Sequence, residues 1–340
     1  MTYGLREFRR ISPMAVLLLV SGGLFATEIT TTPFTLKVIA DIPLPGQSSR
    51  YDYQSYDATR HLLFIAHMGA DTITVVNTQS QFVVTDIGRM SDVHGVLALP
   101  TLGKVYASVT GRNEVVVIDA NTFSIDASIP GGRYPDGMAY MPAAHKLYVS
   151  DEFGGTETVI DIRSHQRVAT IALNGEAGNV QYDAASGHIF VNVQTRNDLV
   201  EIDPASDRIV ARYALPGASH NHGLLIDSSR RLAFVACEGN AKLLVIDMRT
   251  MRVQETLAVG HNPDVLAFDT ALSLLYVASE SGVVSVFQVD ENSVRKVWEQ
   301  RVDSSAHTVA VDPETHRVYL PLENMKGHPV LRIMQPSSSS

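Results

Sequence analysis

Residues 115–151 read VVVIDANTFSIDASIPGGRYPDGMAYMPAAHKLYVSD, four short apolar runs that are separated by turns. The first run ends at Asp119, the second covers 124–129, the third begins at Asp136 and the last covers 146–151. Within the runs apolar residues alternate with polar ones, and Asn, Gly and Pro lie between the runs. This pattern is typical of short antiparallel strands joined by tight turns. We therefore expect a unit of four strands.

The third run belongs to a phrase that returns seven times along the chain. Each copy starts with a variable residue, the leading residue, and continues as an alternating strand that ends at a turn. Successive leading residues are 42, 42, 42, 44, 42 and 43 positions apart. A period in this range that carries only strands is the signature of propeller blades, so the sequence predicts an all-β, seven-bladed β-propeller. The leading residues are Asp52, His94, Asp136, Gly178, His222, Asp264 and His307.

The two ends of the repeat array predict how the ring closes. An outer strand beginning at Leu36 precedes any innermost strand, and the last repeat ends after its third strand near Val330. We expect the N-terminal strand to complete the last blade, because pairing the two ends removes two exposed sheet edges. The propeller is expected over 35–335, with a disordered lead (27–34) and a disordered tail (336–340). In the sixth repeat the outer strand, EQRV, is expected after Trp298.

The N-terminus has the features of an export signal. Three arginines between positions 6 and 10 precede an apolar run over 14–25, which is short for a membrane span. Ala26 suits the last position before a cleavage site, so residues 1–26 are expected to be a signal peptide. An uncleaved anchor is the alternative, because Leu24 stands where a small residue is usual. Apart from this segment we expect no membrane span.

Cysteine content and charge restrict the compartment and the partners. Cys237 is the only cysteine, so an internal disulfide cannot form and stability must come from packing and ring closure. The formal net charge is −9, and apart from the three arginines near the N-terminus the sequence has no cluster of Lys and Arg. Such a chain is poorly suited to phosphate backbones, and we expect no nucleic-acid partner. The mature chain is expected to be periplasmic or secreted.

The repeat resembles that of a known family. The motifs YPDGMAY (134–140) and NPDVLAFD (262–269) fit its P-x-G-x-A-x run, and LYVSDE (147–152) and LYVASE (275–280) match its second strand. In these features the chain looks like the YVTN-repeat, YncE-like seven-bladed β-propellers, over nearly the whole mature length. The resemblance implies the fold and, for function, only a binding scaffold. It departs where proline is missing and histidine stands at the variable position, in DVHG (92–95), SHNHG (219–223) and SAHT (305–308).

The leading residues are the first candidate site, because the innermost strand of each blade lines the channel. Three of them are histidines, spread as evenly as seven positions permit over the second, fifth and seventh blades. Three convergent imidazoles are a ligand set for copper, zinc or iron. Three aspartates lie beside them and are expected to hold ring N–H groups. The predicted metal ligands are His94, His222 and His307, and the supporting carboxylates are Asp52, Asp136 and Asp264.

A second ring is expected four residues beyond the aromatic residue of each second strand. Four of its seven members are glutamates, more than a polar loop requires, and they are expected at the same channel mouth. The glutamates are Glu152, Glu238, Glu280 and Glu323, and the other members are Met68, Thr110 and Gln194.

These two rings leave several functions open. The leading hypothesis is an exported propeller that binds a small ligand or a transition metal at the channel mouth. One alternative is a metal-dependent enzyme, of oxidative or of lyase or hydrolase type, that uses the same residues. Another is a protein-interaction scaffold without channel chemistry. A channel that only holds water, with polar leading residues tolerated but idle, is the simplest alternative.

Overall fold

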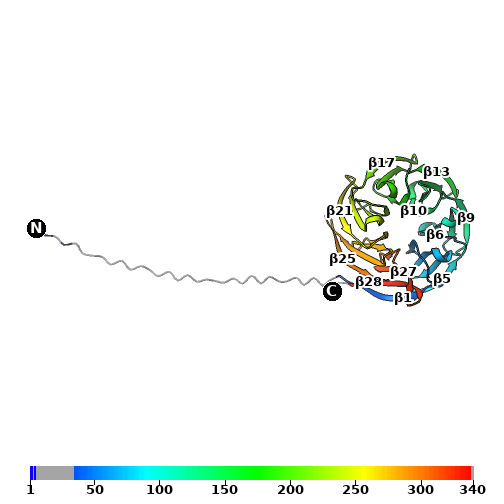
Figure 1. Ribbon diagram of the computed structural model, residues 1–340, viewed down its shortest axis with the longest axis horizontal. Coiled ribbons are helices and arrows are strands. Elements are labelled where there is room, and N and C mark those ends of the chain that lie inside the picture. The colour runs from blue at the N-terminus through cyan, green and yellow to red at the C-terminus, as the bar shows by residue number, and fades with distance from the viewer. Residues whose placement is uncertain (3, 5–33, 292, 338–340) are drawn as a thin grey trace. The chain divides into compact units, whose positions relative to one another are not determined.

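The computed structural model describes residues 1, 2, 4, 34–291 and 293–337. The expected signal peptide (1–26) lies almost entirely outside the described residues, as do positions 27–33 of the expected lead. From position 34 onward the chain forms seven antiparallel four-stranded sheets, which are arranged as the blades of a ring (Figure 1). The all-β, seven-bladed propeller is confirmed. Among the described residues no helix has the length and apolar character needed to cross a membrane.

Each blade runs outward from the channel through four strands. The innermost strands are β2 (Gln54–Asp57), β6 (Val93–Leu99), β10 (Pro135–Met141), β14 (Ala177–Asp183), β18 (Asn221–Asp227), β22 (Pro263–Asp269) and β26 (Ala310–Asp312). The second strands are β3 (Leu62–His67), β7 (Lys104–Val109), β11 (Lys146–Asp151), β15 (His188–Val193), β19 (Leu232–Cys237), β23 (Leu274–Ser279) and β27 (Arg317–Met325).

The two remaining strands of each blade lie farther from the axis. The third strands are β4 (Thr72–Asn77), β8 (Glu114–Asp119), β12 (Thr156–Asp161), β16 (Asp198–Asp203), β20 (Lys242–Asp247), β24 (Val283–Val289) and β28 (His328–Pro336). The outer strands are β5 (Phe82–Ile87), β9 (Ile125–Pro130), β13 (Gln166–Ala172), β17 (Arg208–Ala214), β21 (Arg252–Ala258), β25 (Val294–Arg301) and β1 (Leu36–Pro43).

Short 3-10 turns follow several strands. Four of them follow second strands and two follow innermost strands, and a residue in the left-handed conformation ends each turn. They are η1 (Met68–Ala70), η2 (Pro100–Leu102), η3 (Thr110–Arg112), η4 (Pro142–Ala144), η5 (Gln194–Arg196) and η6 (Glu238–Asn240). Of the turns after second strands, η6 contributes Glu238 and Gly239 to the pocket at the channel mouth.

One aromatic residue per blade occupies the core at the centre of the second strand. These seven rings are at most 2% exposed, so each second strand is buried between the strands of its own blade and the neighbouring blades. They recur with the same spacing as the leading residues, which fixes the register of the innermost strands against them. The set is Phe64, Tyr106, Tyr148, Phe190, Phe234, Tyr276 and Tyr319.

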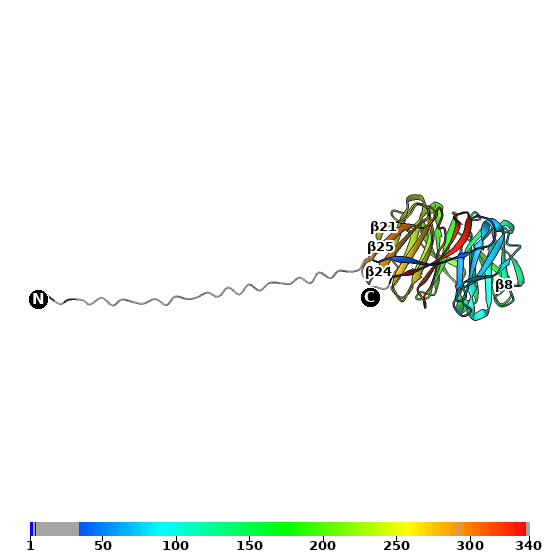
Figure 2. The ribbon, with the colours of Figure 1, turned by 90° about the horizontal axis from the view of Figure 1, so that it is seen from below.

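The ring closes through the two ends of the chain. Strand β1 pairs antiparallel with β28, and the last sheet has the order β1-β28-β27-β26. The blue N-terminal strand therefore lies beside the red C-terminal strands, both along the axis and from the side (Figures 1 and 2). Ile42 faces Leu331 in this pairing and is buried against the core. The expected completion of the last blade by the N-terminal strand is confirmed.

Two boundaries differ from the expectations. The sixth outer strand, β25, begins at Val294, five residues before the expected EQRV segment. A β-bulge at Val286 and Phe287 leaves Val297 unpaired, which interrupts the alternation that marks a strand in the sequence. At the C-terminus β28 continues to Pro336, and the Ser337 N–H donates to Thr35 O at 2.7 Å, so the ordered pairing extends past position 335.

Candidate functional site at one channel mouth

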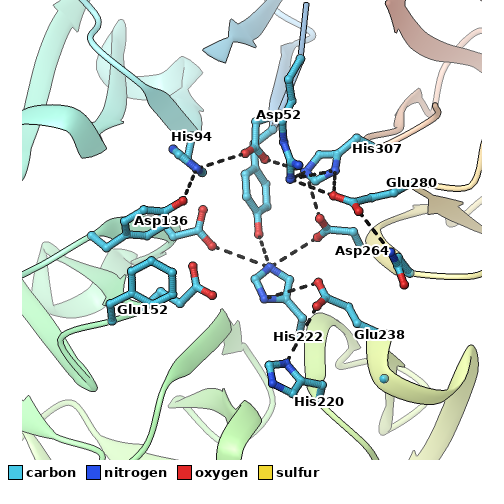
Figure 3. Close-up of a pocket in the computed structure, with 16 residues that line it drawn as sticks. Asp52, His94, Asp136, Glu152, His220, His222, Glu238, Asp264, Glu280 and His307 are labelled. Atoms are coloured by element: carbon cyan, nitrogen blue, oxygen red, sulfur yellow. Dashed lines mark hydrogen bonds and ion pairs between the residues drawn. The ribbon is translucent and has the colours of Figure 1, made fainter. Parts of the chain in front are cut away.

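A polar pocket of about 370 Å³ occupies one mouth of the channel (Figure 3). Six of the seven leading residues line it; the exception is Gly178, which has no side chain. All six side chains are buried, although every one of them is ionisable. They are Asp52, His94, Asp136, His222, Asp264 and His307. The structure therefore brings the three histidines and the three aspartates of the first predicted ring together in one pocket.

Close approach between neighbouring innermost strands positions these side chains. A Cβ on Gly95 would lie 2.1 Å from Asp136 O, and a Cβ on Gly223 would lie 2.0 Å from Asp264 O. Only glycine after the leading residue lets the strands approach this closely. Side chains of the second strands hold the backbone: Ser108 Oγ donates to Asp136 O at 2.6 Å. The leading residues are thus fixed through their main chain.

Imidazoles and carboxylates alternate around the mouth. His307 Nε2 lies 3.1 Å from Asp52 Oδ1 and 2.9 Å from Asp264 Oδ2. His222 Nε2 lies 3.4 Å from Asp264 Oδ1 and 3.7 Å from Asp136 Oδ2. Each of these two rings therefore lies between two aspartates from other blades, as Figure 3 shows.

His94 has a different environment. Its Nδ1 lies 2.8 Å from Asp92 O, its Nε2 lies 3.0 Å from Tyr134 Oη, and Asp52 Oδ2 is 3.8 Å away. Both ring nitrogens are thus engaged by neighbours on the same side of the mouth. The structure pairs each histidine with its own partners, and the three imidazoles do not converge on one point as the predicted three-histidine ligand set requires.

Two other groups of side chains have the spacing of metal ligands. Among the described residues, His222, Glu238 and Asp264 have ligand atoms within 4.8 Å of one another, and so do Asp264, Glu280 and His307. Each group combines one imidazole with two carboxylates, and Asp264 belongs to both. Nitrogen and oxygen ligands of this kind suit zinc, iron and other divalent transition metals.

Three of the four predicted glutamates reach the pocket. Glu152, Glu238 and Glu280 each follow directly on a second strand and line the mouth. Glu323 does not line this pocket, which corrects the expectation for that residue. The reason is that β27 continues to Met325, so Glu323 lies inside a strand and not in the turn that follows one.

The remaining members of the second ring are structural. Thr110 Oγ1 donates to Pro135 O at 2.6 Å, and Met68 begins the turn η1. Gln194 Nε2 donates to Glu152 Oε1 at 3.2 Å, and its Oε1 lies 3.0 Å from His220 Nδ1. Gln194 therefore orients one pocket glutamate from behind the rim.

Burial and charge oppose each other at the histidines. Burial lowers the pKa of His222, but the charges of Asp264, Glu238 and Asp136 outweigh it and raise that pKa to about 9. Burial also opposes protonation of His307, whose pKa is nevertheless raised well above 6.5 by Asp264 and Asp52. Both rings therefore carry a proton at neutral pH, and each of them neutralises part of the surrounding acidic charge.

The carboxylates divide into two electrostatic classes. Burial raises the pKa of Glu152 to about 7, with a further contribution from Asp136, and burial also raises the pKa of Asp136 itself. The hydrogen bond from His307 lowers the pKa of Glu280 to about 2. Burial of Asp52 is outweighed by His307, His94 and Arg50, so its pKa falls below the ordinary range. One mouth thus holds firmly ionised carboxylates beside others that are readily protonated.

Several pocket residues were not predicted from the sequence. Arg50, Tyr134 and Asn262 each lie two positions before a leading residue, as His220 does, so a third set with the same spacing was present in the sequence. Arg50 Nη2 lies 2.9 Å from Glu280 Oε1. Tyr53 follows a leading residue and donates its hydroxyl to Asn179 Oδ1.

Tyr53 also divides the channel. It lines both the polar mouth and a second cavity of about 400 Å³, which is bounded by innermost strands. Its half-buried side chain lies between the two cavities, and its hydroxyl is 3.4 Å from His222 Nε2.

The repeats, the closed ring and the polar pocket define this protein as a seven-bladed β-propeller with an acidic, histidine-containing pocket at one mouth. The chain is 24% identical over 181 residues to the uncharacterized protein YncE of Salmonella typhimurium, and equally to that of Salmonella typhi. This similarity covers 51% of the chain, which spans about half the length of those relatives. Together with the seven blades, it confirms the resemblance to the YncE-like propellers. No protein-family model matches the chain.

Solved structures share the fold at low sequence identity. Hydrazine synthase of Kuenenia stuttgartiensis gives a TM-score of 0.71 at 15% identity, covering 92% of this chain and 99% of the other. The WD40 repeats of RRP9 give a TM-score of 0.77 at 10% identity, covering 89% of this chain and 100% of the other. At such identities the likeness shows the architecture alone.

Proposed function

We propose that this chain is an exported propeller that binds a divalent transition-metal ion at one mouth of its channel. The observation that carries this proposal is the group formed by His222, Glu238 and Asp264, whose ligand atoms lie within 4.8 Å of one another. Ligands bound to one ion at about 2.0–2.2 Å lie roughly 3–3.5 Å apart in tetrahedral geometry, so small side-chain rotations would complete the site.

The surroundings also favour a cation. Six carboxylates line the pocket, and Arg50 is the one arginine or lysine among the lining residues. A divalent ion bound by this group would replace the proton that His222 holds, because imidazole binds metal only in its neutral form. The buried backbone attachment of the leading residues keeps the donors in place before an ion arrives, which reduces the entropic cost of binding.

Direct metal analysis tests the proposal. Full-length mature protein, purified without a histidine tag and stripped with EDTA, is expected to bind Zn²⁺ in calorimetry and to gain thermal stability. A free Zn²⁺ concentration of 100 times the Kd would stabilise the folded protein by about 2.7 kcal/mol. The His222→Gln, His307→Gln double variant should lose the response, whereas His316→Gln, on a surface turn, should keep it. A wild-type protein that binds neither Zn²⁺, Cu²⁺ nor Fe²⁺ would contradict the proposal.

A second candidate function is metal-dependent hydrolysis or elimination, and the size of the pocket favours it. At about 370 Å³ it holds far more than an ion, since a water molecule takes up about 30 Å³. Glu152, with a pKa of about 7, suits a general base at neutral pH. The rings of Tyr134 and Phe153, 4.2 Å apart, offer an apolar shelf for an organic substrate.

Catalysis is tested with metal-loaded protein on p-nitrophenyl phosphate and acetate. Glu152→Gln is expected to lower kcat without changing metal content. Equal rates for wild type and Glu152→Gln, or rates that survive EDTA treatment, would argue against this candidate and leave metal binding as the function.

A further inference from the structure

Asp264 occupies a special position between the two metal-ligand groups. It leads the sixth blade, between His222 of the fifth and His307 of the seventh, and is 4% exposed. Its two oxygens face different histidines: Oδ1 lies 3.4 Å from His222 Nε2, and Oδ2 lies 2.9 Å from His307 Nε2. This is the arrangement of a carboxylate that joins two centres.

One of these oxygens lacks a hydrogen-bond partner. Within the described part of the chain, Asp264 Oδ1 is buried and accepts no hydrogen bond; His222 Nε2, at 3.4 Å, forms only an ion pair with it. A buried carboxylate oxygen without a donor destabilises a folded protein unless a bound cation or water satisfies it. Asp264 lines the pocket, so a small rotation of its side chain would present this enclosed oxygen to a ligand there.

Each side of Asp264 repeats the same set of donors. Each glutamate faces the other ring nitrogen: Glu238 Oε1 lies 3.9 Å from His222 Nδ1, and Glu280 Oε1 lies 3.1 Å from His307 Nδ1. In each set one ligand atom from every residue lies within 4.8 Å of the others, so side-chain rotation would bring the three donors onto one ion, and the two sets share only Asp264. One ion bound at either set therefore leaves the other His–Glu pair without a role.

We infer that the mouth binds two divalent transition-metal ions bridged by Asp264, one held by His222 and Glu238 and the other by His307 and Glu280. This deepens the proposed function and rests on it. Carboxylate-bridged ion pairs are about 3.5–4 Å apart, a distance that a single carboxylate spans with one oxygen on each ion. With three protein ligands at each ion, positions remain open toward the pocket.

Charge balance supports two ions. Five carboxylates surround the pair, and two divalent ions together with the Arg50 guanidinium bring the local charge close to zero once both imidazoles are neutral. With one ion bound, His307 keeps its proton and the same groups carry about one net negative charge. The second ion removes that charge from a buried site where uncompensated charge is costly. The five carboxylates are Asp52, Asp136, Glu238, Asp264 and Glu280.

Stoichiometry tests the inference. EDTA-stripped, tag-free mature protein is titrated with Zn²⁺ by calorimetry, and its bound metal is counted by mass spectrometry after gel filtration. Two equivalents are expected. No binding would overturn the proposed function itself, whereas a single equivalent would overturn the two-ion inference and leave metal binding intact.

Variants identify the bridge. Glu238→Gln and Glu280→Gln should each reduce the content to one ion, while Asp264→Asn should lower the affinity of both ions at least tenfold. Glu323→Gln is the matched control and should keep two ions. Glu323 occupies the equivalent position of the repeat but lies outside the pocket. Circular dichroism verifies that each variant is folded. Two ions retained with unchanged affinity in Asp264→Asn would exclude the bridge.

A spectroscopic signature separates a bridged pair from two distant sites. With Mn²⁺ as the probe, electron paramagnetic resonance of fully loaded protein should show an exchange-coupled pair, and Glu280→Gln should return the signal to that of an isolated ion. Uncoupled signals at full loading would overturn the bridged arrangement.

Discussion

At the scale of single residues, a glycine directly after a leading residue controls the geometry of the site. At Gly223 an added Cβ would meet Asp264 O at 2.0 Å, far inside van der Waals contact. The clash is with backbone, which cannot rotate away as a side chain can. The absence of a side chain at this position therefore determines where the central carboxylate of the mouth lies.

Gly223→Ala is expected to destabilise the protein by about 1–3 kcal/mol, as overpacking of a core does, and to weaken Zn²⁺ binding by moving Asp264. Urea unfolding and calorimetry measure the two effects. Gly88→Ala is the control, since nothing lies within 4 Å of a Cβ at that position. Equal stability of the two variants would mean that the strands separate at little cost.

In the third blade a single residue, Glu157, departs from the apolar pattern of the repeat. Glu157 is fully buried in β12, where other third strands carry Ile or a similar apolar residue. Ser150 Oγ donates to its Oε1 at 2.7 Å, while Oε2 has no partner among the described residues. Burial raises the pKa of Glu157 well above its ordinary value of 4.5, so the folded protein holds it as the neutral acid.

This residue predicts a pH dependence of stability. The unfolded chain releases the Glu157 proton near pH 4.5 while the folded chain keeps it, so its contribution falls as the pH rises above that value. Glu157→Gln should remove the decline and raise the free energy of unfolding at pH 7, by about 1.4 kcal/mol for each unit by which the pKa is raised.

Thermal unfolding from pH 5 to 8 measures this difference. The exposed Glu314→Gln serves as the control and should follow the wild type. A wild type and a Glu157→Gln variant with parallel pH profiles would contradict the assignment of a neutral Glu157.

Among the elements, β1 has the largest effect on closure. It lies at the other end of the chain from its partner β28, and seven of its residues pair in register with that strand. Without β1 the last blade would expose an unpaired edge, a template for association. Ile42, 6% exposed, anchors the strand in the core, while Val38 on the same strand is 50% exposed.

These two positions provide a matched test of closure. Ile42→Asp is expected to lower the free energy of unfolding by roughly 3–5 kcal/mol, because it removes core packing and buries a charge. Val38→Asp should change it by less than about 0.5 kcal/mol. Urea unfolding and light scattering compare the variants. Similar values for both would show that β1 contributes little to the stability of the ring.

The outer strands include the boundary that the sequence did not predict. In the sixth blade a bulge skips one residue between the partners of Val286 and Phe287, so Trp298 and Lys296 face neighbouring positions. The same bulge occurs between the third and outer strands of five other blades, so it does not by itself set where β25 begins. A search for alternating apolar residues detects such a strand only in part, because strict alternation assumes strand pairing without a bulge.

At the scale of the whole molecule, ring closure assembles the site. Asp52 and His307 are more than 250 positions apart in the sequence, yet their side chains lie 3.1 Å apart. The mouth therefore exists only when all blades are in place, and a bound ion that contacts the fifth, sixth and seventh blades would stabilise the closed ring as a unit. Export and a role as an interaction scaffold remain predictions from the sequence.

The sequence by itself determined the number of blades, the closing strand and nine of the side chains at the channel mouth, six from the first predicted ring and three glutamates from the second. These features follow from strand periodicity and from a repeat of constant length, which are local properties of the chain. Tertiary structure alone decided that His94 is held by Asp92 and Tyr134, that Glu323 lies outside the pocket, and that Asp264 lies between two histidines. Glu323 lies outside because β27 continues past it to Met325. The other two outcomes depend on how closely strands of neighbouring blades approach, and this packing between blades is not encoded by any single repeat.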